Sequence, residues 1–156
     1  MERSTLRLKP KMNAQRLRHG FPWVYANETV TDRRTRALAP GTVAHLQDSD
    51  RVPLGTVAVN PNSKIIGRVL DLSPDVDIDQ SWVSARVQAA YRLRARIFRD
   101  PFYRLIHAEA DGLPGVIVDR FGSLAVLQPN AAWADARVDL FVAALCDIDG
   151  IDTVVL

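Results

Sequence analysis

The chain has 156 residues, 47% of them hydrophobic and 24% charged, with a formal net charge of +2. This composition is typical of a globular protein and excludes a disordered chain, and no apolar run approaches the roughly 18 residues that span a bilayer. The polar N-terminus lacks the apolar core of a signal peptide, so we expect a cytoplasmic protein with no membrane partner.

The first part of the chain has the strand pattern of a small β-barrel. Polar and apolar residues alternate over 5–8, and Pro10 ends this run because proline cannot donate to a strand ladder. Gly20 follows a short basic segment and is typical of a helix C-terminus. We therefore expect residues 1–73 to form one domain, with a helix over 11–19 and strands at 5–8, 23–25, 41–46, 54–59 and 64–72.

Residues 74–100 are predicted to be an acidic linker followed by a basic helix. Four aspartates lie within 71–80, and Ser81 is expected to cap the helix. The apolar positions of this helix share one face and are Val83, Val87, Ala90 and Ile97. A basic stripe on the opposite side consists of Arg92, Arg96 and Arg99. Pro101 then prevents the helix from continuing.

Residues 101–156 predict an incomplete α+β domain of order β-β-α-β, which makes the chain mixed α/β. Short apolar runs within 103–127 are separated by the turn dipeptides Asp111-Gly112 and Pro114-Gly115. Asn130 is expected to cap a helix over 131–146, and residues 151–156 to form a strand. Because terminal edge strands are normally blunted or charged, this apolar end indicates a domain truncated at its C-terminal strand.

Two segments together resemble one protein family. Residues 107–122 read His-Ala-Glu-Ala-Asp-Gly-Leu-Pro-Gly-Val-Ile-Val-Asp-Arg-Phe-Gly, and residues 16–25 read Arg-Leu-Arg-His-Gly-Phe-Pro-Trp-Val-Tyr. Both are similar to segments of the AdoMet-dependent 23S rRNA cytosine-5 methyltransferases that begin with a PUA domain. The resemblance implies a PUA-like barrel for the first domain, ribosomal RNA as partner, and S-adenosylmethionine as cofactor of a methyltransferase domain beyond residue 156.

The chain itself offers no catalytic constellation. Its eight glycines never form Gly-x-Gly-x-x-Gly after a strand, so no cofactor-binding residue is predicted. The three histidines lack metal-ligand spacing, and Cys146 is the single cysteine, which excludes a disulfide framework and a zinc ribbon. We expect no catalytic or metal-binding residue, no cofactor in this chain, and no activity from it alone.

Charge separation along the sequence indicates binding to nucleic acid. Residues 1–36 hold nine Lys and Arg against three acids, and residues 86–104 hold six Arg against Asp100, whereas the remainder holds five bases and fourteen acids. The expected RNA-binding residues are Lys11, Arg16, Arg18, His19, Trp23, Arg92, Arg96 and Arg99. For Trp23, packing inside the barrel is favoured over stacking on a base. The competing interpretation of the arginine stripe pairs it with Asp75, Asp77 and Asp79.

Two residues of the 107–122 segment, Asp111 and Arg120, have roles that the sequence leaves open. Arg120 either pairs with Asp111 or Asp119 to fix the turns, or contacts the substrate. Two functions remain for the chain: the RNA-recognition portion of an rRNA methyltransferase, or a stand-alone RNA-binding or assembly module. The oligomeric state is undetermined, with a homodimer as one option.

Overall fold

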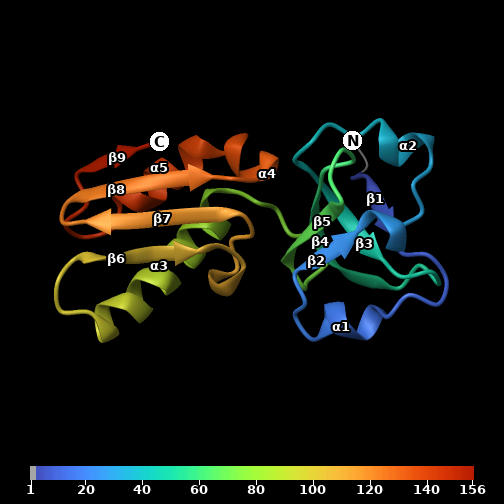
Figure 1. Ribbon diagram of the computed structural model, residues 1–156, viewed down its shortest axis with the longest axis horizontal. Coiled ribbons are helices and arrows are strands. Elements are labelled where there is room, and N and C mark those ends of the chain that lie inside the picture. The colour runs from blue at the N-terminus through green and yellow to red at the C-terminus, as the bar shows by residue number, and fades with distance from the viewer. Residues whose placement is uncertain (1–2) are drawn as a thin grey trace. The chain divides into compact units, whose positions relative to one another are not determined.

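A computed structural model describes residues 3–156, which divide into two compact units, 3–76 and Asp77–Leu156 (Figure 1). The division falls three residues after position 73, where the sequence suggested that the first domain ends. The helix expected in the segment 74–100 lies within the second unit. None of the helices among residues 3–156 is both long and apolar enough to cross a membrane.

The first unit is a curled five-stranded sheet of order β1-β3-β4-β5-β2. Its strands are β1 (Thr5–Arg7), β2 (Trp23–Tyr25), β3 (Thr42–Gln47), β4 (Pro53–Val59) and β5 (Ile65–Asp71). β1 pairs with β3 in parallel, and the other pairs are antiparallel. The expected small β-barrel is thus present as a curled sheet, and the mixed α/β fold class is confirmed.

Alternation in the strands builds the core of this unit. Leu6 and Leu8 are buried on either side of the half-buried Arg7, because successive side chains of a strand point to opposite faces. Gly55 in β4 has φ +149°, and a Cβ there would lie 2.3 Å from the main-chain oxygen of Asp71. Only glycine permits this close approach of β4 to β5.

Short helices connect these strands. Helix α1 (Ala14–Arg18) is shorter than the expected 11–19, because Lys11 has φ 68° and the side chain of Asn13 caps the helix by accepting from the Gln15 amide at 3.1 Å. A 3-10 turn, η1 (Ala26–Glu28), and helix α2 (Arg33–Arg36) were not foreseen. Asp32 is the N-cap of α2, and its carboxylate accepts from the Thr35 amide at 2.8 Å.

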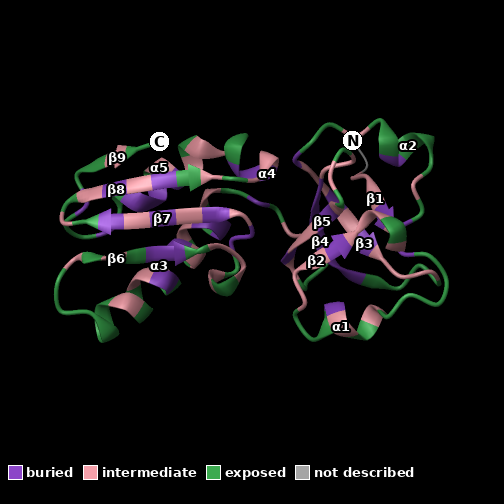
Figure 2. Ribbon diagram, in the orientation of Figure 1, coloured by how far each residue is buried: buried purple, intermediate pink, exposed green. Residues whose placement is uncertain are grey.

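The second unit is a four-stranded sheet of order β6-β7-β8-β9 with helices on one face (Figure 1). Its strands are β6 (Phe102–His107), β7 (Val116–Phe121), β8 (Leu124–Pro129) and β9 (Thr153–Val155). Its helical elements are α3 (Gln80–Ile97), η2 (Ala108–Asp111), α4 (Ala132–Asp135) and α5 (Val138–Cys146). β9 joins β8 in parallel, and α3 packs against α5 and β6. Buried and half-buried residues alternate along β7 (Figure 2).

Three local expectations in this unit were wrong. Asp79, rather than Ser81, caps α3 by accepting from the Trp82 amide at 2.9 Å. Ile97 is 63% exposed, because it forms the last turn of α3 and extends past the apolar face. The helix expected over 131–146 is broken after Ala136 and begins from Ala131 rather than from an Asn130 cap.

The break between α4 and α5 has a local cause. Arg137 adopts φ −131°, outside the helical region, and its Nη1 donates to the main-chain oxygen of Trp133 at 3.0 Å. This hydrogen bond satisfies a carbonyl at the end of α4. Two short helices therefore replace the single helix that the apolar periodicity predicted.

Candidate nucleic-acid interface

The first group of expected RNA-binding residues lies on α1, its flanks and β2. Lys11, Arg18 and His19 are exposed, whereas Arg16 and Trp23 are half-buried. Among the described residues, no ion pair joins Lys11 or His19 to an acid. The helix is held by Leu17, which is fully buried in the core of the first unit, so its cations are presented from a fixed position.

Arg16 is engaged inside the unit. Its guanidinium pairs with Glu28, and it lies over the Phe21 ring at 4.5 Å and near the Tyr25 ring at 5.7 Å. Glu28 also accepts from the main-chain amide of Tyr25 at 2.9 Å. These contacts fix the 16–28 segment and neutralise much of the Arg16 charge, so Arg16 contributes less to an anion-facing surface than its sequence position suggested.

Arg18 and Trp23 lie nearer the solvent. Arg18 Nη2 is 3.3 Å from a carboxylate oxygen of Asp48, and its side chain is 40% exposed, so this pair is weak. Val24 is fully buried, and its strand neighbour Trp23 points to the other face, edge-on to Phe21 at 6.2 Å. The expectation that Trp23 fills the barrel is therefore corrected, because strand alternation gives the core position to Val24.

The second group, Arg92, Arg96 and Arg99, is fully on the surface of the second unit. Arg92 and Arg96 project from α3, and Arg99 lies two residues beyond the end of that helix. Among the described residues of this unit, none of the three forms an ion pair. Two of their suggested acidic partners are used elsewhere, since Asp79 caps α3 and Asp75 lies 3.1 Å from Arg3 Nη1. The stripe therefore remains open to a polyanion.

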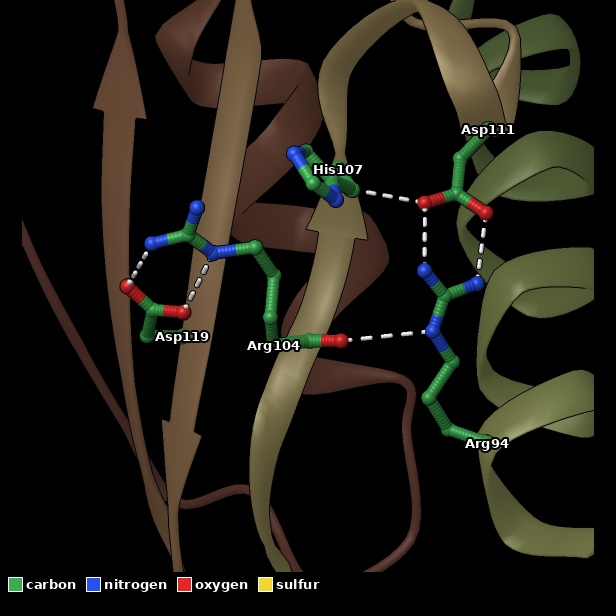
Figure 3. A network of polar contacts seen from close by, with 5 residues as sticks. All are labelled: Arg94, Arg104, His107, Asp111 and Asp119. Atoms are coloured by element: carbon green, nitrogen blue, oxygen red, sulfur yellow. Dashed lines mark hydrogen bonds and ion pairs between the residues drawn. The ribbon is translucent and has the colours of Figure 1, made fainter. Parts of the chain in front are cut away.

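Asp111 is the centre of a polar network in which the ion pair with Arg94 is largely buried (Figure 3). Both its carboxylate oxygens accept from Arg94 of α3, at 2.5 and 2.7 Å, and one also accepts from the His107 amide at 2.7 Å. Arg94 Nε donates to the main-chain oxygen of Arg104 at 3.2 Å. The side chains of Arg94 and Asp111 are only 12% and 8% exposed. The network holds η2 and β6 against α3.

A second ion pair of the same sheet lies at the surface. Arg104 donates to both oxygens of Asp119, at 2.9 and 3.1 Å (Figure 3). The hydrogen bond to Asp119, and then its charge, raise the pKa of Arg104 above its ordinary value. This pair joins β6 to β7, since the two residues are directly opposite in the ladder.

Arg120 takes neither of the roles suggested by the sequence. It is 6% exposed, so it offers little to a substrate, and Asp111 and Asp119 pair with Arg94 and Arg104 instead. Alternation in β7 turns Arg120 toward the helix-covered face, as it does Val116 and Val118. There its guanidinium donates to the main-chain oxygens of Gly122 and Asp149 and to the Tyr103 hydroxyl, at 2.9, 3.0 and 3.3 Å.

The Pro114-Gly115 turn also has a structural partner. The indole nitrogen of Trp133 donates to the main-chain oxygen of Pro114 at 2.8 Å, in a buried hydrogen bond between α4 and the turn. Sequence reasoning missed this contact, because nothing in the turn indicates an indole donor nineteen residues later. The 107–122 segment is thus a scaffold.

No cluster of three or more metal-ligating side chains occurs within residues 3–156.

Comparisons with known proteins agree with this architecture. Residues 6–72 match the family described as PUA-like domain. The chain is 35% identical over 127 residues to Ribosomal RNA large subunit methyltransferase I of Cronobacter sakazakii, covering 80% of this chain and 32% of that protein. It is 33% identical over 138 residues to Ribosomal RNA large subunit methyltransferase of Deinococcus radiodurans, covering 82% and 33%. The chain spans about a third of the length of these curated relatives.

Solved structures share the fold over nearly the whole chain. A Streptococcus mutans protein described as a SAM-dependent methyltransferase superposes with a TM-score of 0.79 at 16% identity, covering 96% of this chain and 39% of that one. A second solved structure, described as "a putative methyltransferase complexed with SAH", gives a TM-score of 0.77 at 15% identity, covering 99% of this chain and 40% of that one. At these identities the similarity concerns the fold of both units.

Proposed function

We propose that this chain is the RNA-recognition portion of an rRNA large subunit methyltransferase. It contains a PUA-like domain, and it is homologous to about a third of the length of such enzymes. In this role it positions ribosomal RNA in the cytoplasm for methylation of a cytosine at C5 by an AdoMet-dependent domain outside residues 1–156. The domain limits 1–73, 74–100 and 101–156 belong to the same proposal. The homology favours this setting over a stand-alone RNA-binding module.

The observation that carries the proposal is the PUA-like match over residues 6–72, in a unit that presents Lys11, Arg18 and His19 on its surface. Phosphate contacts from such side chains hold RNA in register without reading its sequence. The second unit adds Arg92, Arg96 and Arg99, which have no acidic partner among its described residues. In the first unit, Trp23 of β2 is half-buried and lies edge-on to Phe21, and it is proposed to stack on an unpaired base.

Replacing Arg92, Arg96 and Arg99 together by glutamine tests the RNA-facing assignment. We expect the melting temperature to change little, because exposed charges away from special features usually matter within ~0.5 kcal/mol each. RNA affinity should fall, and the slope of log K against log salt should become shallower by up to about one unit per lost phosphate contact. The measurements are thermal unfolding and binding to an rRNA fragment between about 50 and 200 mM salt.

The variant Arg51→Gln is the control for that experiment. Arg51 is also exposed, but it lies in an acidic turn beside Asp48 and Asp50, so its replacement should leave the salt slope unchanged. A triple variant that loses stability and keeps the wild-type slope would remove the stripe from the RNA-binding surface. If the RNA affinity of the wild-type chain does not change with salt concentration, the result would count against the proposed function as a whole.

The cofactor assignment has a separate test. The chain has no glycine-rich loop between a strand and a helix that could cradle AdoMet, so we expect no saturable heat when AdoMet is titrated into it. Incubation with rRNA and labelled AdoMet should transfer no methyl group. Saturable AdoMet binding to the 156-residue chain would overturn the assignment of the cofactor site to residues outside it.

A further inference from the structure

A cavity of about 350 Å³ lies in the first unit, beside β1 and α2. Three arginines line it, Arg3, Arg7 and Arg34, together with the hydroxyl side chains of Ser4 and Thr5. None of these belongs to the α1 and β2 group described above. A polar cavity with several cations and hydroxyl donors has the composition of an anion-binding site.

Two of the charged groups at this cavity already have partners. Arg3 Nη1 lies 3.1 Å from a carboxylate oxygen of Asp75 and donates to the main-chain oxygen of Val76 at 3.0 Å. Asp32, the single acid in the lining, accepts from the Thr35 amide at 2.8 Å and its hydroxyl at 3.0 Å. The hydrogen bond from the Thr35 amide, followed by that from its hydroxyl, holds the pKa of Asp32 below its ordinary value.

No ion pair within 4 Å joins Arg7 or Arg34 to an acid among residues 3–156, although the charge of Arg34 helps to lower the pKa of Asp32. Arg7 Nε is buried and lacks a hydrogen-bond partner, the single side-chain atom in this condition within the described residues. A buried donor without an acceptor is costly, and native structures supply a partner for nearly all such groups. Leu6 and Leu8 fill the core on either side, so strand alternation holds Arg7 at the cavity.

We propose that this cavity binds a phosphate group through Arg7 and Arg34. A planar guanidinium matches two phosphate oxygens through parallel N–H donors, and the oxygens that remain can accept from the hydroxyls of Ser4 and Thr5. The phosphate comes either from an RNA backbone or from free inorganic phosphate or a nucleotide. The first source rests on the RNA-recognition function proposed above, whereas binding of phosphate to the cavity does not.

The test follows the arginine Nε–H signals of the 156-residue chain by NMR. Inorganic phosphate is titrated in one arm and a single-stranded RNA oligonucleotide in the other. We expect the Arg7 signal to shift and saturate with phosphate, and the variants Arg7→Gln and Arg34→Gln to weaken phosphate binding by roughly tenfold or more. If RNA is the source, the same variants should weaken RNA binding by a similar factor.

Helix α2 supplies matched controls. Arg33 and Arg36 are exposed on the same four-residue helix but do not line the cavity, so Arg33→Gln and Arg36→Gln should keep the wild-type affinity for phosphate. If Arg7→Gln does not fold, two other variants still test the site. Arg34→Gln changes an exposed side chain, and Arg7→Lys keeps the positive charge at the half-buried position.

Each outcome has a separate meaning. Saturable phosphate binding that is lost in the Arg7 and Arg34 variants supports the site, and unchanged RNA affinity in those variants then assigns it to free phosphate or a nucleotide. A chain that binds RNA but shows no saturable phosphate shift overturns the cavity proposal and leaves the proposed function standing. A chain that binds phosphate at the cavity but no RNA overturns the proposed function and not the site. Equal losses in Arg33→Gln and Arg34→Gln would also overturn the site.

Discussion

Replacing Asp111 by alanine is expected to lower the free energy of unfolding of the second unit by about 3–5 kcal/mol, because it leaves the Arg94 guanidinium, whose side chain is only 12% exposed, without its counter-charge. The change removes two charge-assisted hydrogen bonds from Arg94 and one from the His107 amide. The measurement is urea unfolding followed through the backbone amide signals of β6, β7 and β8.

Asp119→Ala is the matched control, since Asp119 is also a carboxylate that takes two donors from one arginine of the same sheet. Its pair with Arg104 is at the surface, with side chains 28% and 43% exposed, so we expect a loss below about 1 kcal/mol. An equal loss of unfolding free energy in Asp111→Ala and Asp119→Ala would show that the Arg94–Asp111 pair stabilises the unit no more than an exposed ion pair does. The double variant Arg94→Met, Asp111→Leu should recover much of the stability, because an apolar pair of similar volume requires no desolvation of charge.

The contrast between Asp111 and Arg120 shows what the sequence could predict. The residues 107–122 were recognisable as a motif, and the turns and strands around it were predictable from Gly, Pro and apolar alternation. Their partners were not, because Arg94 comes from α3 and Asp149 from the loop before β9. The simplest hypothesis for Arg120 was an ion pair with an aspartate nearby in the sequence. In the structure it instead donates to main-chain oxygens, one of them on the distant Asp149.

The role of Arg94 has a signal in the helical periodicity of the sequence. Arg94 follows Ala90 by four residues and so continues the helix face of Val83, Val87 and Ala90, whereas Arg92 and Arg96 lie off that face. Periodicity therefore separates the buried arginine from the exposed ones. The Asp79 cap had no comparable signal, because aspartate and serine are both good N-caps and Ser81 lies only two residues further on.

The cavity at Arg7 shows a different limit. Alternation over residues 5–8 predicts that Arg7 points away from Leu6 and Leu8, as it does. The short helix α2, which brings Arg34 and its N-cap Asp32 to the same cavity, has no apolar periodicity and only four residues, so no sequence pattern predicts it there. A binding site assembled from a strand and a distant short helix becomes visible only when the chain is folded.

Replacing Trp133 by alanine should have an effect as large as that of Asp111→Ala, about 3–5 kcal/mol lost from the second unit. Trp133 is 1% exposed, and its ring lies 6.0 Å from Trp82 of α3 and 5.7 Å from Phe141 of α5, edge-on to both. The indole thus joins α4 to both larger helices of the unit, and its removal leaves a cavity among rigid neighbours that can collapse only in part.

Trp133→Phe separates the packing of the ring from its hydrogen bond. The phenyl ring keeps most of the apolar contact but leaves the Pro114 carbonyl without its donor, so we expect a loss of about 1–3 kcal/mol, clearly smaller than for alanine. Urea unfolding of both variants gives the comparison, with the amide signals of β1 to β5 as the internal control that the first unit is unaffected. Equal losses in the two variants would show that the hydrogen bond to Pro114, rather than ring packing, dominates, and that this turn depends on α4 for its stability.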